Sequence, residues 1–510
     1  MFDYASIGDA IGLVFSIQTL LWVLLGVFIG VGVGAMPGLS PAPAIALLLP
    51  LTFTLNLPAS LGLLIGVYKG GIYGGSISAI SFATPGTAEA GATVLDGHKL
   101  MKAGKGKKAL HMALYSSVTG DLISSILTIF LAPALALVAL NFGPSERLWL
   151  IALAIGLIGA LSGDHFAKGL FSAALGLFIG TIGSDPVSMV PRNTFGQWWL
   201  ADGINMIPLI IGLFAIATML EKIVEIVRNW SVIGEIHEKV MQELAGREES
   251  LSFREYMSCW KEMAIGTGVG TFVGILPGLG ATVGAYLSYG VARQVSPNKG
   301  IGTGKLEGVA AAESGNNATA GPTLVPLLAF GIPGGTIAAM LGAALAIKGV
   351  QAGPRMFELY PVEIYALFVI LIVSNILVLF VGRGFAGVYA KLGQMPAQLL
   401  VPVILAMAFV GAFTYQNNAF DVWLALGFGC LGFILRLGRI PEAPLIITFL
   451  LAPLAEQSLR RALLINRGDW GDALFDSNLA IGLAVATVVL VLFLARSQMS
   501  SRIKSLSSDE

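Results

Sequence analysis

The chain has 510 residues, of which 55% are hydrophobic and only 12% are charged, and its mean hydropathy is +0.82. A soluble domain carries roughly 25% charged residues, so this composition excludes an ordinary soluble protein. The formal net charge of zero gives no reason to expect a nucleic-acid partner. The two cysteines, Cys259 and Cys430, exclude a framework of several disulfides.

Several stretches of about 20 residues are almost free of charge and predict membrane-spanning helices. They include 122–140, 147–162, 363–381 and 479–495. A helix of that length crosses the hydrocarbon core, which is about 30 Å thick, whereas a transmembrane β-barrel would show alternating segments of about ten residues. We therefore expect an all-α polytopic membrane protein with about ten to twelve transmembrane helices, some of them broken or re-entrant.

Proline-glycine segments flanked by apolar residues occur four times, twice in each half of the chain. In chain order they are GVGVGAMPGL (30–39), SFATPGT (81–87), GTFVGILPGL (270–279) and AFGIPGG (329–335). Pro277 follows Pro37 by 240 residues, and Pro333 follows Pro85 by 248 residues. The same order in both halves predicts a duplicated membrane unit, and matched breaks of this kind point to the binding site of a transporter.

The duplication divides the chain into two repeats. We expect a first membrane repeat at 1–228, an amphipathic linker at 229–262, a second repeat at 263–496 and a polar tail at 497–510. The loop 96–108 carries five lysines, but the corresponding loop 347–358 has one lysine and one arginine. Parallel repeats would place strongly basic loops at both positions. The difference favours inverted repeats, with loop 96–108 on the cytoplasmic side.

The breaks have a specific chemistry. Proline lacks a backbone N–H group, so it leaves carbonyl groups unpaired, and glycine relaxes the allowed backbone angles. Unpaired backbone at membrane depth is tolerated only inside protein or beside a water-filled cavity. Freed carbonyls suit Na⁺, whereas the N-terminus of a half-helix suits an anion.

Polar residues cluster around the breaks and form two candidate sets. The expected substrate-binding residues are Pro37, Gly38, Ser40, Lys69, Gly75, Ser76, Pro85, Gly86, Thr87, Pro277, Gly278, Thr282, Asn316, Asn317, Pro333, Gly334 and Gly335. The expected ion-binding residues, for Na⁺ as the metal, are Ser81, Thr84, Glu313, Ser314, Thr319 and Thr336.

Two charges in apolar sequence stand out. Lys69 is expected to hold a substrate carboxylate; the alternatives are an ion pair with Glu89 or extension of the side chain to the membrane interface. Glu313 lies beside Ser314 and Asn316, in the most polar stretch that is flanked on both sides by apolar sequence. It is expected to bind a cation or carry a proton, and the alternative is a polar residue at the entrance of a span.

Six motifs, in order, resemble the large membrane subunit of tripartite tricarboxylate transporters, the TctA family. They are GVGVGAMPGLSPAPAIALLLPLTF, GVYKGGIYGGSISAISFATPGT, DGHKLMKAGKGKKAL, GILPGLGATVGAYLSY, EGVAAAESGNNATAGPTLVPLLAFGIPGG and EQSLRRALLINRGD. The resemblance extends from about residue 20 to residue 470 and implies ion-coupled secondary uptake of dicarboxylates and tricarboxylates across the bacterial inner membrane. It also implies Na⁺ or H⁺ as the coupling ion and an elevator-like movement. The implied partners are a small TctB-like membrane subunit and a periplasmic TctC-like solute-binding protein, with a homodimer of the complex as the assembly.

Some positions depart from the family pattern. They are Pro41, Pro43, Lys69, Glu89 and His98. Because these changes fall at the expected site, the resemblance does not single out citrate as the substrate.

The sequence leaves two alternatives to transport, an intramembrane serine hydrolase and a channel. An intramembrane serine hydrolase could use Ser76, but it needs a histidine or lysine base within reach, and no histidine falls in a clear span. A channel is a further alternative, although two broken-helix pairs favour alternating access. No Walker A pattern occurs, so the sequence shows no site for ATP-driven transport. We expect no enzyme activity and no cofactor apart from Na⁺ or H⁺ as the coupling ion. Glu456, Arg460 and Arg461 are expected to form a surface or subunit contact.

Overall fold

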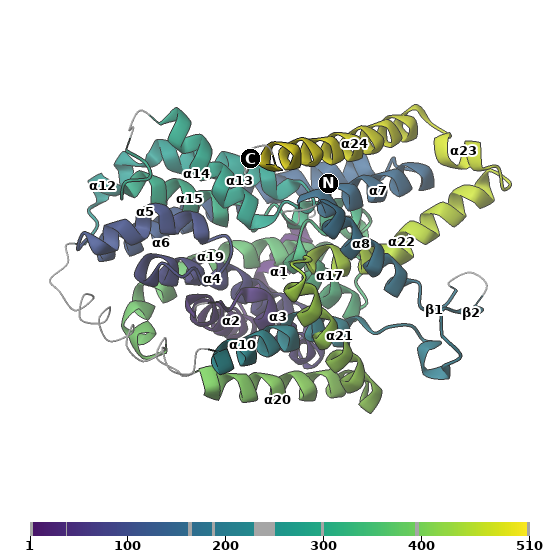
Figure 1. Ribbon diagram of the computed structural model, residues 1–510, viewed down its shortest axis with the longest axis horizontal. Coiled ribbons are helices and arrows are strands. Elements are labelled where there is room, and N and C mark those ends of the chain that lie inside the picture. The colour runs from purple at the N-terminus through teal and green to yellow at the C-terminus, as the bar shows by residue number, and fades with distance from the viewer. Residues whose placement is uncertain are drawn as a thin grey trace.

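Helices make up almost the entire fold (Figure 1). The computed structural model describes residues 4–36, 38–161, 166–185, 189–228, 250–296, 300–392 and 397–506. The only strands in these ranges are β1 (Gly183–Ser184) and β2 (Pro191–Arg192), which pair antiparallel with Gly183 opposite Arg192.

The helices of the first half end at residue 228. Its helices are α1 (Tyr4–Val14), α2 (Ile17–Ala35), α3 (Pro41–Leu48), the 3₁₀ helix η1 (Pro50–Thr54), α4 (Leu57–Phe82), α5 (Gly91–Lys102), α6 (Gly106–Ala139), α7 (Pro144–Leu161), α8 (Phe166–Gly180), the 3₁₀ helix η2 (Trp198–Leu200), α9 (Met206–Ile210), the π-helix η3 (Ile211–Ile216) and α10 (Ala217–Arg228).

The second half continues in the same way. Its helices are α12 (Phe253–Ser258), α13 (Trp260–Ile275), α14 (Gly280–Val295), α15 (Leu306–Asn317), α16 (Leu324–Phe330), α17 (Thr336–Ile347), α18 (Met356–Leu359), α19 (Pro361–Leu392), α20 (Ala397–Gln416), α21 (Ala419–Leu437), α22 (Ala443–Ile465), α23 (Trp470–Phe475) and α24 (Asn478–Leu506).

Among the described residues, five helical segments are long and apolar enough to cross a membrane. They are Ile17–Ala35, Gly106–Ala139, Met206–Arg228, Pro361–Gly384 and Ala419–Leu437. Five further apolar helices are shorter, at 10–17 residues. A mixture of full-length and short apolar helices is what broken membrane helices produce. The prediction of an all-α polytopic membrane protein is confirmed.

A ladder of glycines brings α2 against α4. Gly26, Gly30 and Gly34 lie one turn apart on α2, and a Cβ atom on each would collide with a backbone carbonyl of α4. The carbonyls belong to residues 63, 67 and 71. Small residues at this spacing let two membrane helices approach until their backbones touch.

The same ladder recurs between α13 and α15. Gly266, Gly270 and Gly274 each follow their counterparts in α2 by 240 residues. A Cβ atom on these glycines would collide with the backbone at residues 311, 315 and 319, which follow 63, 67 and 71 by 248 residues. The duplication therefore extends from the sequence to the packing of the helices. The inverted orientation of the two units stays a prediction.

One long helix, α6, packs against both units. It contacts α4 and α5 on one side and α13, α15 and α16 on the other. Many of its buried residues are small or polar, and they include Ser117, Gly120, Asp121, Ser124 and Thr128. These residues recur every three or four positions and so share one face of the helix. The polar interior of the protein is built along this face.

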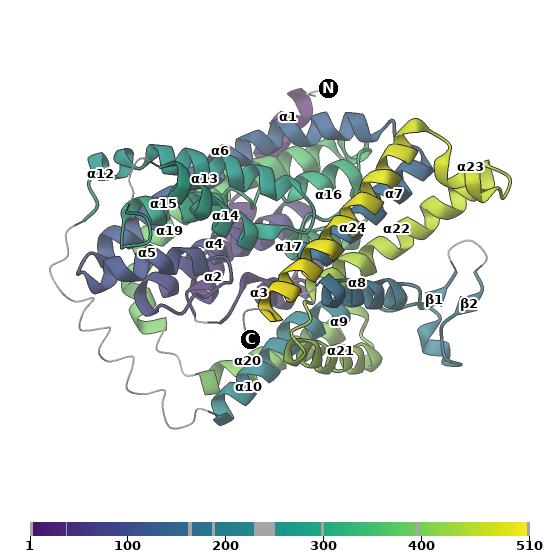
Figure 2. The same ribbon diagram turned by 45° about the horizontal axis from the view of Figure 1, so that its top comes forward.

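The predicted boundaries remain predictions, although parts of them can be located. Most of the expected linker, 229–249, lies outside the described residues, and α13 begins within the remainder at Trp260. Helix α24 continues to Leu506, so most of the expected polar tail is helical. Figure 2 shows α12 at one end of the molecule and the β-hairpin with α23 at the opposite end.

Candidate transport site

All four proline-glycine segments interrupt a helix. The first falls between α2 and α3, the second between α4 and α5, the third between α13 and α14, and the fourth between α16 and α17. Each contains a residue with positive φ just after a helix ends: Gly38 at 74°, Ala83 at 55°, Gly278 at 88° and Gly331 at 75°. Pro37 itself lies outside the described residues.

The breaks meet in two pairs. In the first half, a Cβ atom on Gly86 of the second break would collide with the carbonyl of Gly34, at the end of the helix that leads into the first break. In the second half, the N–H of Gly278 in the third break donates to the carbonyl of Gly334 in the fourth, at 2.9 Å. Each half thus places its two interruptions side by side.

The two pairs are joined through α17. This helix begins directly after the fourth break, and it packs against α3, which begins directly after the first break, and against α4. Figures 1 and 2 both show α3 and α17 in the middle of the helix bundle. The interruptions are therefore parts of one central region.

Glu313 on α15 is fully buried and lies at the centre of a polar cluster. Its Oε1 atom accepts hydrogen bonds from Ser76 Oγ at 2.5 Å and from the Thr93 hydroxyl. Its Oε2 atom accepts from Ser117 Oγ at 2.9 Å and from Asn317 Nδ2 at 3.5 Å. No basic side chain in the described part of the chain forms an ion pair with this carboxylate. A buried charge without a counter-ion marks a functional site in a membrane protein.

Helices from both repeats contribute to this cluster. Ser76 comes from α4, Thr93 from α5 and Ser117 from α6, whereas Glu313 and Asn317 come from α15. The Asn317 amide also donates to Ser117 Oγ at 2.8 Å, which fixes both side chains. The cluster therefore couples the positions of the two glycine-packed units.

Lys69 lies elsewhere on α4 and is 2% exposed. Its Nζ atom forms an ion pair with Asp121 Oδ2 at 2.9 Å and donates to Ser125 Oγ at 3.0 Å and to the Leu371 carbonyl at 2.7 Å. Its partner is thus Asp121 on α6, and the alternative pair with Glu89 is not formed. Three protein groups hold the ammonium group, and its role toward substrate stays a prediction.

The structure places the remaining predicted residues in several environments. Ser314 and Thr319 hydroxyls donate to carbonyls of their own helix or turn, and Thr84 is exposed. Asn316 is fully buried, and neither of its side-chain polar atoms has a hydrogen-bond partner. Buried and unpaired polar atoms need a partner such as water, an ion or a substrate.

The other members of the predicted sets follow the breaks. The substrate-binding residues Ser40, Gly75, Pro85, Thr87, Pro277, Thr282, Pro333 and Gly335, and the ion-binding residues Ser81 and Thr336, lie in or beside the interruptions. Thr87 Oγ1 lies beside Gly75, so close that a Cβ atom there would collide with it. No group of three or more His, Cys, Asp or Glu side chains able to hold a metal ion occurs in the ranges described.

Several residues of this region were missed by sequence reasoning. Ser117 and Asp121 belong to the long helix α6, and the acidic residue within the polar segment YSSVTGDLISS is the signal in the sequence that could have revealed them. Thr93 lies in the loop-like DG segment, which folds as α5. Ser76, one of the expected substrate-binding residues, donates its hydroxyl to Glu313, and a contact of Ser76 with substrate stays a prediction. The ionisable group that contacts the Ser76 hydroxyl is thus this carboxylate, and not the histidine or lysine that the hydrolase alternative needs.

Asp96 on α5 forms a second contact between the two halves of the chain, separate from the Glu313 cluster. Its side chain is fully buried and accepts hydrogen bonds from the N–H groups of Gly302, Gly304 and Lys305 and from Tyr289 Oη at 2.9 Å. A carboxylate with several backbone donors forms strong, charge-assisted bonds. It fastens α5 of the first half to the loop between α14 and α15.

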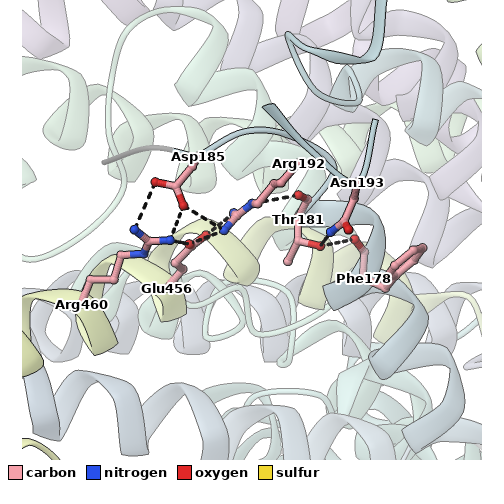
Figure 3. Close-up of polar contacts among 7 residues, drawn as sticks. All are labelled: Phe178, Thr181, Asp185, Arg192, Asn193, Glu456 and Arg460. Carbon is pink, nitrogen blue, oxygen red and sulfur yellow. Dashed lines mark hydrogen bonds and ion pairs between the residues drawn. The ribbon is translucent and has the colours of Figure 1, made fainter. Parts of the chain in front are cut away.

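The predicted contact involving Glu456 is a network within the chain (Figure 3). Arg192 of β2 and Arg460 of α22 both bind Glu456 and Asp185. Arg192 Nη1 lies 2.5 Å from Glu456 Oε1, and Arg460 Nη2 lies 2.8 Å from the same atom. The network anchors the β-hairpin on α22, while Arg461 points to the exposed surface.

Comparisons with known proteins agree with this architecture. The family model described as the tripartite tricarboxylate transporter TctA family matches residues 20–447. An Agrobacterium vitis protein, described as an uncharacterized 52.8 kDa protein in the TAR-I ttuC' 3' region, is 34% identical over 445 residues, which are 84% of each chain. A second protein of that organism, from the TAR-II ttuC' 3' region, is 35% identical over 229 residues, 44% of this chain and 93% of its own length. No solved structure matches significantly.

The family model spans the two glycine-packed units and all four breaks. Members of the family are non-enzymatic membrane components, and the family implies a tripartite system with TctB and TctC partners. The expectation that the chain is not an enzyme is confirmed. The chain belongs to the TctA family of tripartite tricarboxylate transporters.

Proposed function

We propose that this TctA subunit takes up dicarboxylates or tricarboxylates by ion-coupled alternating access at the central region where the four breaks meet. A TctC-like solute-binding protein delivers the substrate, and a TctB-like subunit completes the membrane complex. The observation that carries this proposal is the pairing of the breaks in each half, seen in the bond between Gly278 and Gly334. Paired helix ends at membrane depth are the substrate sites of secondary transporters.

The N-terminus of α17 supports carboxylate binding. Its first intrahelical bond runs from the N–H of Ala339 to the carbonyl of Gly335, so the preceding N–H groups of the helix lack intrahelical partners. A Cβ atom on Gly335 would meet no atom within 4 Å, and no side chain caps the helix. Free N–H groups, open space and the positive end of the helix dipole suit a carboxylate.

The Glu313 cluster is the candidate site for the coupling cation. The polar atoms around its carboxylate are the hydroxyl oxygens of Ser76, Thr93 and Ser117 and the amide nitrogen of Asn317. Oxygen ligands around a carboxylate suit Na⁺, and the same carboxylate can carry a proton. Binding a cation there would neutralise a buried negative charge and draw α4, α5, α6 and α15 together.

Helix α6 supports the proposed membrane orientation. With 34 residues this helix is about 51 Å long and exceeds the hydrocarbon core, so its two ends lie on opposite sides. Lysines 105, 107 and 108 lie at its start. We place this end, with loop 96–108, in the cytoplasm of a bacterium. An elevator-like movement and a homodimer of the complex complete the proposal.

The test is transport by the purified subunit, co-reconstituted with its small subunit in proteoliposomes and supplied with the cognate solute-binding protein. Radiolabelled citrate, malate and succinate are presented with either an Na⁺ gradient or a pH gradient. We expect saturable uptake of one or more of them, driven by one gradient and dependent on the binding protein. If the rate of uptake is the same with and without either gradient, or does not saturate with substrate concentration, the result contradicts coupled transport and favours a channel.

A further inference from the structure

A lysine from the end of the first repeat lies over the first break. Lys222 belongs to α10, which follows the π-helix η3 directly. A Cβ atom on Gly38 would lie 2.9 Å from Lys222 Nζ and 3.4 Å from its Cε atom. Gly38 is exposed at the surface, and the Lys222 side chain is 19% exposed. An ammonium group therefore lies against accessible backbone at one of the four interruptions.

Apolar packing holds α10 in this position. Met219 and Ile226, one turn before and one turn after Lys222, are buried in a cluster with Leu39 and Val401. Leu39 is the residue next to Gly38. The helix is therefore anchored on the first break itself, and the placement of Lys222 does not depend on its own long side chain.

The ammonium group has an acidic neighbour on the same helix. Glu225 Oε2 lies 2.7 Å from Lys222 Nζ, three residues further along α10, and the Glu225 side chain is 52% exposed. An ion pair at the surface between residues three positions apart contributes little to stability. A carboxylate of the substrate can therefore displace Glu225 from the ammonium group at little energetic cost.

The first break needs a positive charge more than the fourth does. Helix α3 has proline at positions 41 and 43, and proline has no N–H group. The hydroxyl of Ser40 does not cap this helix. By contrast, α17 begins with Thr336 and has no proline in its first turn. The first break thus offers an anion fewer backbone donors, and a lysine compensates as a compact point charge.

We propose that Lys222 binds a carboxylate group of the transported substrate at the first break. This inference deepens the proposed function and rests on it. The substrate would then be held at two helix interruptions, by the ammonium group at the first and by backbone N–H groups at the fourth. Such a division favours substrates with two or more carboxylates over those with one.

The experiment compares Lys222→Gln and Lys222→Arg with wild type in the reconstituted system, using succinate and a monocarboxylate, butyrate, as competitor. We expect Lys222→Gln to raise the KM for succinate roughly tenfold or more, with a smaller change in kcat, because a charge-assisted hydrogen bond is lost. Butyrate should then compete relatively better. Lys222→Arg should retain part of the affinity. The matched control is Lys168→Gln, which removes a lysine of α8 that donates to the carbonyl of Gly438, at the end of α21.

A second variant separates charge from structure. Lys222→Cys, made with Cys430→Ser so that no other exposed cysteine remains among the described residues, is treated with a positively or a negatively charged thiol reagent. We expect the aminoethyl reagent to restore succinate uptake and the sulfonate reagent to reduce it further. An unchanged KM in Lys222→Gln, or equal effects of both reagents, would overturn the role of Lys222. Absence of carboxylate uptake by wild type would instead overturn the proposed function.

Discussion

Lys69 Nζ lies 2.9 Å from Asp121 Oδ2, and both side chains are almost completely buried between α4 and α6. The Leu371 carbonyl adds a contact to α19, so three helices meet at one ion pair. A charge isolated in the membrane interior is costly, and pairing removes most of that cost. This pair explains why a lysine can lie within a glycine-rich apolar helix.

The first prediction concerns the loss of one partner. Asp121→Asn leaves the Lys69 ammonium group buried without a counter-ion, and this change should destabilise the protein by about 3–5 kcal/mol. Replacing both residues by apolar ones of similar size, Lys69→Met with Asp121→Leu, should recover most of that loss. The measurement is the thermal stability of the purified protein in detergent.

The double variant also decides the role of Lys69. If Lys69 binds substrate, the double variant should assemble normally and yet lose carboxylate uptake. Normal uptake by an assembled double variant would reject the predicted substrate role and leave the ion pair as a structural element.

The second prediction concerns Glu313. Glu313→Gln keeps the shape of the side chain but removes its charge, so a cation has nothing to neutralise there. We expect uptake to lose its dependence on the driving ion gradient, with a smaller effect on substrate affinity. The control is Glu358→Gln, on the exposed surface of α18. Identical Na⁺ and pH dependence in Glu313→Gln and wild type would argue against this coupling site.

The third prediction tests the duplicated packing. Gly30→Ala and Gly270→Ala each add one methyl group where a helix backbone is already in contact. Both should destabilise the protein by about 1–3 kcal/mol, as overpacking does. Gly268→Ala is the matched control, because it lies on α13 with no atom within 4 Å of its Cβ position. A Gly270→Ala protein as stable as Gly268→Ala would refute the close approach of α13 and α15.

The sequence predicts the breaks well because they are local. Proline and glycine act on their own turn, so the ends of α2, α4, α13 and α16 fall where the motifs lie. The partners of Lys69 and Glu313 could not be predicted in the same way. Most of them lie on other helices, α4, α5, α6 and α19, and these contacts depend on how distant helices pack. The sequence does not single out Lys222 either, because charged residues on an amphipathic helix such as α10 are typical of a surface helix.

The fourth prediction concerns Glu255 at the surface, where α12 meets the start of α6. Hydrogen bonds lower the pKa of Glu255 to about 2. The largest effect comes from Lys108, and smaller ones come from the N–H and hydroxyl groups of Ser252. The carboxylate lies 2.7 Å from Lys108 Nζ and completes a capping box with Ser252. A depressed pKa means that the contact stabilises the folded state above the ordinary pKa of 4.5 and is lost as the pH falls toward 2.

We therefore expect the attachment of α12 to be unchanged between neutral pH and about pH 4.5, and to weaken progressively below it. Hydrogen–deuterium exchange of peptides covering 250–258, corrected for the intrinsic effect of pH, measures this attachment. Glu255→Gln should show the weakened state already at neutral pH, since it loses both the ion pair and the charged cap. Lys108→Gln serves as the matched variant, because it removes the ion pair and leaves the capping box intact. Complete loss of protection in wild type above pH 4.5 would contradict the low pKa, because the carboxylate is still charged there.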